Sequence, residues 1–187
     1  MQNHGDKIIV WTGQRSIVTD TIAREGRYVV KSRFVDQKYE ESAWIFQTAY
    51  RAVMQLAAKR LERPEGAESP IWVYKEPTYI GAGEDIHFLK LEIPAEAVLL
   101  FDHRKWNKIL NLSYIGKDEK EEEEFAEWLR GRGIRDSMDV FSSGFYPMEK
   151  RKVTDSWARL LDDEEIPDRY MQGMIWEIRR EWIIEEK

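Results

Sequence analysis

The sequence contains no cysteine in its 187 residues. This absence excludes disulfide bonds, zinc sites with thiolate ligands, iron–sulfur clusters and catalysis by a thiol. It fits a protein of a reducing compartment. A chain of this length can bury roughly 70 % of the surface that its unfolded form exposes, so it can form a stable core without cross-links.

Long apolar runs are also missing. No stretch approaches the roughly 20 apolar residues that a membrane-spanning helix needs, and the longest purely apolar run in the middle of the chain, residues 97–101, has the length of a strand. The first residues hold no apolar segment of the kind that follows the basic start of a secretory signal. We therefore predict a soluble cytoplasmic protein with no membrane partner.

Motifs for metals and for common cofactors do not occur in the sequence. Its three histidines, His4, His87 and His103, lack the spacing of three or four residues that a helical metal site requires. No HExxH, GxGxxG, Walker or GxSxG motif is present. The sequence predicts no metal site, and it favours a role for His87 in the core or in a cleft.

Charge and aromatic content narrow the classes of function. The formal net charge of −6 argues against a protein that coats nucleic acid, because phosphate binding needs a basic surface. A local basic surface is still allowed, since residues 1–33 hold six Lys and Arg against three Asp and Glu, and residues 150–152 are all basic. Eight Trp, eight Tyr and seven Phe are many for this length, and such residues fill cores or line ligand sites.

Four short apolar segments predict strands, because they are rich in β-branched residues or alternate apolar with polar residues. They are residues 7–12, 70–74, 87–93 and 97–101. In the third segment His87, Leu89, Leu91 and Ile93 face one way, as in a half-buried strand.

Helices are predicted where apolar residues recur at helical spacing. Ser16 is placed to cap the first helix, which Gly26 ends, and Asp102 is placed to cap a later one. The longest helix has one apolar face formed by Phe46, Tyr50, Val53, Ala57 and Leu61. The helix after Asp102 is short and carries Trp106, Ile109 and Leu110, and the other predicted helices span residues 16–25, 39–61, 118–130 and 153–161.

Three segments remain. Residues 77–84 and 131–147 are predicted to be loops, and residues 170–187 fit a helix and a strand equally well. No repeat, low-complexity tract or linker divides the chain. We predict a single domain over residues 1–187, with residues 1–6 as a flexible tail. Its expected class is α+β, with a mixed or antiparallel sheet and flanking helices.

Scattered segments carry a family resemblance. They are residues 10–14 (VWTGQ), 70–74 (PIWVY), 91–94 (LEIP) with 98–100 (VLL), Asp102, Trp106, residues 156–157 (SW) and 172–177 (QGMIWE). With these segments the chain resembles an uncharacterised bacterial family, domain of unknown function 3841, over most of its length. That resemblance implies a fold and no activity.

The order of the parts resembles, more distantly, the ADP-ribosyltransferase superfamily and especially its DNA-modifying branch. The segments are residues 9–17 (IVWTGQRSI), 22–26 (IAREG) and 172–178 (QGMIWEI). In that branch a first strand ends in a polar residue that holds NAD, and a helix ending in glycine follows. Later strands wall the nicotinamide cleft, and a glutamate on a late strand completes catalysis. The resemblance implies NAD as the ligand and a macromolecule as the target.

The resemblance also implies which residues bind the nucleotide. The superfamily usually offers His or Arg on the first strand, whereas this chain offers Thr12 and Gln14, with Arg15 beside them. Aromatic rings for stacking would come from Trp11, Trp72 and Tyr74. Each of these rings would serve equally well in a core.

The catalytic position implied by the resemblance is the late carboxylate, and two residues are candidates for it, Glu177 and Gln172. A carboxylate there orients the ribose and stabilises developing positive charge. The neutral amide of Gln172 cannot supply that charge. If Gln172 holds the position, the fold would persist as a binding pocket without transferase activity.

Three functions follow as hypotheses. The first is an NAD-dependent ADP-ribosyltransferase that acts on a macromolecule. The second is a nucleotide-binding module that performs no chemistry. The third is a protein-interaction factor in which exposed tryptophans form the contact patch.

Overall fold

The computed structural model describes residues 6–31, 43–162 and 165–187. The expected tail, residues 1–6, lies outside this range except for Asp6. Six antiparallel strands form the main sheet in the order β5-β6-β3-β1-β4-β8. Their bounds are β1 (Lys7–Arg15), β3 (Ile71–Tyr74), β4 (Ile86–Pro94), β5 (Leu99–Asp102), β6 (Met171–Ile175) and β8 (Ile183–Glu186). A second sheet pairs β2 (Arg27–Val29) with β7 (Glu177–Arg179).

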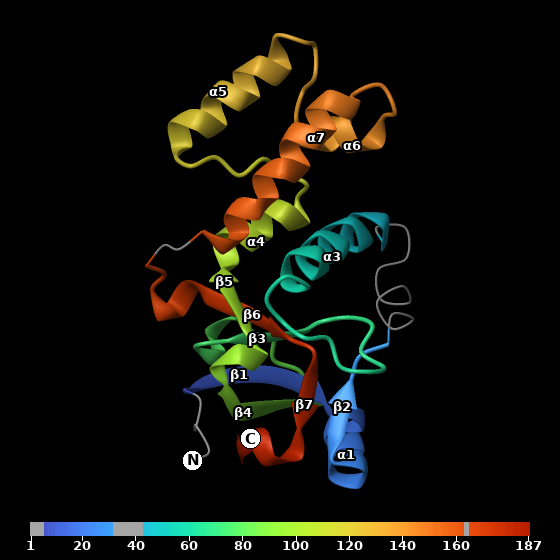
Figure 1. Cartoon of the computed structure of the whole chain (residues 1–187), viewed down its shortest axis with the longest axis vertical. Helices are drawn as coiled ribbons and strands as arrows, with labels where there is room; N and C mark the ends of the chain where they lie inside the picture. The colour runs from blue at the N-terminus through green and yellow to red at the C-terminus, as the bar shows by residue number, and fades with distance from the viewer. Residues whose placement is uncertain (1–5, 32–42, 163–164) are drawn as a thin grey trace.

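Six α-helices accompany the sheets in the described part of the chain. They are α1 (Ser16–Glu25), α3 (Ala43–Ala57), α4 (His103–Leu110), α5 (Glu119–Arg130), α6 (Ser137–Ser142) and α7 (Pro147–Ser156). Helices α4 to α7 gather at one end of the molecule and the main sheet lies at the other, while α1 lies beside β2 (Figure 1). The prediction of a single α+β domain with an antiparallel sheet is confirmed. Among the described helices, none is long and apolar enough to cross a membrane.

Two hydrophobic cores lie on opposite faces of the sheet. Phe101 and Met174 face the helical side, where Trp106 of α4 packs against them. Val73 and Ile175 face the side that α1 covers with Ile22. Full burial of such a side chain stabilises the fold by about 1.5–3 kcal/mol. The alternation of side chains along β3, β5 and β6 therefore joins two layers through one sheet.

The first strand and helix follow the sequence prediction, with one correction. Strand β1 continues through Arg15, and α1 follows it without a loop. Gly26 ends α1 at φ 78°, in the left-handed region that favours glycine. Ser16 is not the N-cap, because the cap residue is Arg15 and its side chain makes no capping bond. The hydroxyl of Ser16 contacts Asp85 and His87 instead.

The two acidic caps behave differently from Ser16. Asp102 accepts a hydrogen bond of 2.8 Å from the backbone N–H of Arg104, and Asp118 accepts one of 2.8 Å from that of Glu121. The predicted short helix after Asp102 is confirmed as α4, and α5 begins one residue after the predicted start at residue 118. The long helix predicted over residues 39–61 is shorter than expected, since α3 ends at Ala57. The prediction for residues 39–42 lies outside the described residues.

Two predictions between residues 131 and 161 need correction in part. The expected loop contains α6, whose Asp136 accepts hydrogen bonds from two backbone N–H groups and whose Val140 and Phe141 are buried. Helix α7 begins six residues before the predicted residue 153, at Pro147, where proline costs no helical hydrogen bond. A 3₁₀ helix (Trp157–Leu161) continues it.

Residues 170–187 form the strands β6, β7 and β8, with a 3₁₀ helix (Arg180–Trp182) between the last two, which settles the sequence ambiguity in favour of strands. The seven residues from 172 to 178 are all buried, so no apolar–polar alternation marks them. Residues buried on both faces give no periodic signal, and this is why the pattern could not separate strand from helix.

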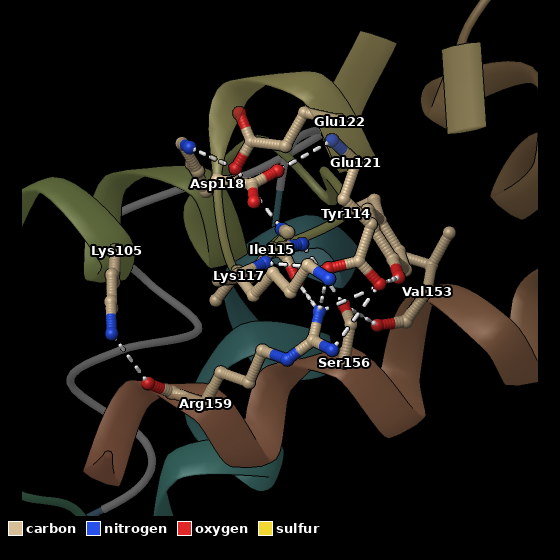
Figure 2. A network of polar contacts seen from close by, with 12 residues as sticks. Lys105, Tyr114, Ile115, Lys117, Asp118, Glu121, Glu122, Val153, Ser156 and Arg159 are labelled. Atoms are coloured by element: carbon tan, nitrogen blue, oxygen red, sulfur yellow. Dashed lines mark hydrogen bonds and ion pairs between the residues drawn. The ribbon is translucent and has the colours of Figure 1, made fainter. Parts of the chain in front are cut away.

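A network of hydrogen bonds around Arg159 connects α5 to the rest of the molecule (Figure 2). The guanidinium of Arg159 donates to the carbonyl of Ile115 at 2.8 Å and to the carboxylate of Glu121 at 3.0 Å. Tyr114 donates to the same carboxylate at 2.9 Å, and Lys105 donates to the carbonyl of Arg159 at 3.0 Å. These groups satisfy one another, which is typical of a structural network.

Candidate functional site

The candidate site is a cavity of about 380 Å³ between β1 and β3. The described backbone pairs these strands at one position, Trp11 with Tyr74. Beyond that pair the cavity opens, and the hydroxyl of Thr12 crosses to the carbonyl of Trp72 at 2.8 Å. Gln14 in turn donates to the Thr12 hydroxyl at 2.8 Å. A short polar chain therefore runs along one wall of the cavity.

Four of the five residues expected to bind a nucleotide line this cavity: Thr12, Gln14, Trp72 and Tyr74. The fifth, Trp11, does not line it, and its ring instead lies 5.3 Å from the ammonium of Lys90. In the strand register Trp11 lies opposite Lys90 and Tyr74 and shares their face of the sheet, whereas Thr12 and Gln14 lie on the other face.

Gly13 allows the cavity to close at one side. A Cβ atom built on Gly13 would lie 2.4 Å from Cγ2 of Ile80 and 3.2 Å from Cγ2 of Ile86. The first distance is too short for a real contact, so only glycine lets Ile80 pack directly on β1. Ile80 and Ile86 form the apolar part of the lining.

Trp72 is a fixed wall of the cavity. Its indole N–H donates to the hydroxyl of Tyr50 at 3.1 Å, and its ring lies 4.9 Å from that of Trp106. Tyr50 also meets Trp72 edge to face, with ring centroids 5.2 Å apart. The side chain is therefore held by aromatic neighbours on α3 and α4, in the geometry that such pairs prefer.

A strip of aromatic side chains leads outward from the cavity. Tyr74 lies 6.5 Å from Tyr79, Tyr79 stacks on His103 at 4.3 Å, and His103 lies parallel to Tyr170 at 6.1 Å. The guanidinium of Arg104 sits 4.4 Å above the ring of Tyr170. Rings with a cation above them can stack with planar ligands.

Burial lowers the pKa of His103 from its usual value of 6.5, in opposition to the nearby Asp102 carboxylate. Neutral imidazole is thereby favoured, which suits stacking on Tyr79. Sequence reasoning missed Tyr79, His103 and Tyr170, because they lie in turns or at a helix start, far apart in the chain. The high aromatic content was the only sequence signal that pointed toward them.

Gln172, the first of the two candidate catalytic residues, lies beside the cavity. Strand β6 places it directly opposite Tyr74 on β3 and Phe101 on β5. The residue is only 5 % exposed. Its side-chain amide forms no hydrogen bond with any residue that the structure describes. Gln172 is thus a largely buried polar residue next to the cavity, whereas the fully buried side-chain nitrogen without a partner among the described residues is Nε1 of Trp176.

Glu177, the second candidate, lies elsewhere. It belongs to β7 in the small sheet and lines a separate cavity of about 430 Å³ with Trp176 and Trp182. Its carboxylate is 2.7 Å from the guanidinium of Arg179 and 3.5 Å from that of Arg27. Two cations therefore neutralise this buried acid, as buried charges require.

No group of three or more His, Asp or Glu side chains in the described ranges has the arrangement of a metal site. The polar groups of the candidate site are hydroxyls and an amide, which recognise ligands by hydrogen bonds. The site has the character of an organic-ligand pocket, in which apolar walls surround a few polar groups.

The chain belongs to the family described as Domain of unknown function (DUF3841), whose family model matches residues 9–184. Searches of curated proteins and of solved structures found no significant match. The family assignment bears out the first resemblance drawn from the sequence.

Proposed function

We propose that this protein binds NAD or a related nucleotide in the cavity between β1 and β3. The observation that carries the proposal is the convergence of Thr12, Gln14, Trp72 and Tyr74 on one cavity. Pockets for small ligands usually have volumes of about 300–1,000 Å³. At about 380 Å³ the cavity suits one nucleotide half, with the other half lying along the aromatic strip.

Each part of the site has a role in this proposal. Trp72 and Tyr79 offer ring faces for a nicotinamide or adenine base. Gln14 offers its side-chain amide to ribose or to the carboxamide of nicotinamide, and the buried Thr12 hydroxyl, bonded to Trp72 and Gln14, holds that amide in place. Arg104 lies over Tyr170 at the outer end of the strip and is paired with the Asp102 carboxylate, so a phosphate there would share its guanidinium with Asp102. The resemblance to ADP-ribosyltransferases selects NAD from among the nucleotides.

Binding without chemistry is the favoured form of this function. The residue next to the cavity is the neutral Gln172, and an amide cannot stabilise the oxocarbenium charge that forms when nicotinamide leaves. The carboxylate of Glu177 lies at the other cavity and is paired with two arginines.

ADP-ribosyl transfer to a macromolecule is the second candidate. It draws support from the strand order, in which β3 lies between β1 and β6. The first strand and a late strand thus flank the same aromatic residues, in keeping with the order of parts in the superfamily. This candidate predicts release of nicotinamide and loss of that release in Glu177→Gln.

Calorimetric titration with NAD tests the proposal. We expect saturable binding of one NAD per chain, weakened about tenfold or more in Tyr79→Ala, since stacking on one ring contributes about 1–3 kcal/mol. Trp44→Ala is the matched control, because Trp44 is 40 % exposed, close to the 42 % of Tyr79, and does not line the cavity. No heat at millimolar NAD, or equal loss in both variants, would contradict the proposal.

The ligand recovered after the titration separates the two forms. Intact NAD is expected for a binding module, whereas free nicotinamide would establish a transferase or a hydrolase. If nicotinamide appears and Glu177→Gln abolishes it, Glu177 holds the catalytic position after all.

A further inference from the structure

Three side chains from distant parts of the sequence meet at the start of α1. The hydroxyl oxygen of Ser16 lies 2.9 Å from Nε2 of His87. The other ring nitrogen of His87, Nδ1, lies 3.0 Å from the carboxylate of Glu186. The order is nucleophile, base and acid, each within hydrogen-bonding distance of the next.

The sheet explains why these residues converge. In the register of β1 and β4, Gln14 lies opposite His87, and in that of β4 and β8, Leu89 lies opposite Glu186. Residues two apart on a strand share a face, so His87 and Glu186 are diagonal neighbours on one face of the sheet. Ser16 follows β1 directly, and as the first residue of α1 it presents its hydroxyl at a sharp strand-to-helix junction.

We propose that Ser16, His87 and Glu186 form a serine acyl-transfer site that hydrolyses small activated esters. In the first step the Ser16 oxygen bonds to the carbonyl carbon of the ester while its proton passes to Nε2 of His87. The carbon–oxygen bond to the leaving group then breaks, and the alcohol departs with that proton. A water molecule next attacks the acyl-serine, which releases the carboxylic acid and restores the Ser16 hydroxyl.

Each remaining feature of the site has a defined part. Glu186 is a positioning residue, because its carboxylate holds the Nδ1–H tautomer and leaves Nε2 free to accept a proton. The backbone N–H of Ser16 donates to Asp85, and the N–H groups that follow it in the first turn of α1 have no partner within the helix and can donate to the oxyanion. The site is open, since the side chains of His87 and Glu186 are 36 % and 45 % exposed. That openness, with the apolar Ile17 beside it at 67 % exposure, suits short acyl groups and ready access of water.

Asp85 competes for the Ser16 proton and gives the proposal a distinctive test. Its carboxylate accepts a hydrogen bond of 3.2 Å from the backbone N–H of Ser16 and also contacts the Ser16 hydroxyl. These hydrogen bonds lower the pKa of Asp85, so it stays ionised as an acceptor. A serine hydroxyl has one proton, and donation to Asp85 withholds it from His87. Weakening this acceptor is therefore expected to raise the reactivity of Ser16.

Labelling with an alkyl fluorophosphonate, read by intact mass, tests the proposal. The Ser16 oxygen bonds to phosphorus, the phosphorus–fluorine bond breaks, and fluoride leaves. We expect one adduct per chain in the wild type and none in Ser16→Ala. His87→Gln should slow labelling on the order of a hundredfold, as loss of a general base does. Ser142→Ala is the control and should label normally, because this exposed hydroxyl donates to the Met138 carbonyl.

Three further variants separate catalysis from structure. Asp85→Asn should label faster than the wild type, which a purely structural capping role would not produce. Glu186→Gln should label more slowly, and Glu186→Asp should recover much of the rate because it restores a carboxylate. Circular dichroism establishes that each variant is folded.

No adduct on the folded wild type, an adduct that survives Ser16→Ala, or an unchanged rate in His87→Gln would overturn the proposal. NAD titration of Ser16→Ala keeps the two proposals apart. That variant is expected to bind NAD as the wild type does, since Ser16 does not line the β1–β3 cavity.

Discussion

The hydroxyl of Thr12 donates a 2.8 Å hydrogen bond to the carbonyl of Trp72, so a side chain takes the place of a backbone rung between β1 and β3. Thr12 is 1 % exposed, and its hydroxyl also accepts the amide N–H of Gln14. This hydrogen bond connects β1 to β3 next to the Trp11–Tyr74 pair, where the two strands begin to diverge. It therefore sets the width of the cavity that we propose as a nucleotide site.

Thr12→Val tests this tie, because valine keeps the shape and removes the hydroxyl. The Trp72 carbonyl and the Gln14 amide each lose a partner, and we expect a loss of about 1–3 kcal/mol in the free energy of unfolding. NAD binding should weaken in the same variant. Urea unfolding and calorimetry provide the two measurements. Thr21→Val serves as the comparison, since its hydroxyl only bonds back to Ile17 within α1.

Gly13→Ala tests the close packing of Ile80 on β1. The added methyl group would fall 2.4 Å from Cγ2 of Ile80. We expect destabilisation of about 1–3 kcal/mol and a disturbed cavity. The double variant Gly13→Ala with Ile80→Ala should be more stable than the sum of the single effects predicts. A strictly additive double-mutant cycle would show that this contact is not the constraint.

Glu121 gives a prediction of acid sensitivity. The backbone N–H of Lys117 and the hydroxyl of Tyr114, with help from Arg159, lower its pKa from 4.5 to about 2. A lowered pKa means that the folded state favours the carboxylate. Its contribution to stability is complete above the unfolded value of 4.5 and is lost as the pH falls toward about 2.

Melting curves across this range check the assignment. The wild type should melt at a higher temperature than Glu121→Gln near neutral pH, and the difference should shrink between pH 4.5 and about 2. Glu124→Gln is the matched control, because this more exposed acid of α5 pairs only with Lys120. A difference that stays constant with pH would show that the carboxylate charge of Glu121 does not fasten α5.

Gln172→Glu tests which residue holds the place of the catalytic carboxylate. If Gln172 holds it, the new acid lies opposite Tyr74 and can stabilise the charge that develops on ribose. We expect the variant to release nicotinamide from NAD at a rate above the wild type, measured by chromatography. Gln172→Ala provides the control for the loss of the amide alone. A folded, NAD-binding Gln172→Glu without any release would argue against the position.

Much of the fold could be predicted from the sequence, because its signals are local. The apolar run before Gln14, the glycine at Gly26 and the acidic cap Asp102 identify β1, α1 and α4, and apolar residues at helical spacing identify α5. Helix α6 was missed because six residues are too few for a periodic pattern.

The resemblance, and no local pattern, grouped Thr12, Gln14, Trp72 and Tyr74. They lie on neighbouring strands and line one cavity, and their role in binding stays a prediction. Tyr79 reaches the cavity from a turn, and such long-range placement has no local sequence signal. His87 was expected to lie on the same strand face as leucines. The structure also places it between Ser16 and Glu186. That position depends on the register of neighbouring strands, which a single sequence does not reveal.

The most direct test of the central claim is the nuclear magnetic resonance spectrum of the indole N–H groups during a titration with NAD. The proposal predicts that the signal of Trp72, assigned with Trp72→Phe, shifts and saturates. The signal of Trp176, which lines the other cavity, should stay in place. A saturating shift of Trp176 with Trp72 unmoved would place the nucleotide at the second cavity. No shift in either signal at millimolar NAD would contradict nucleotide binding by this protein.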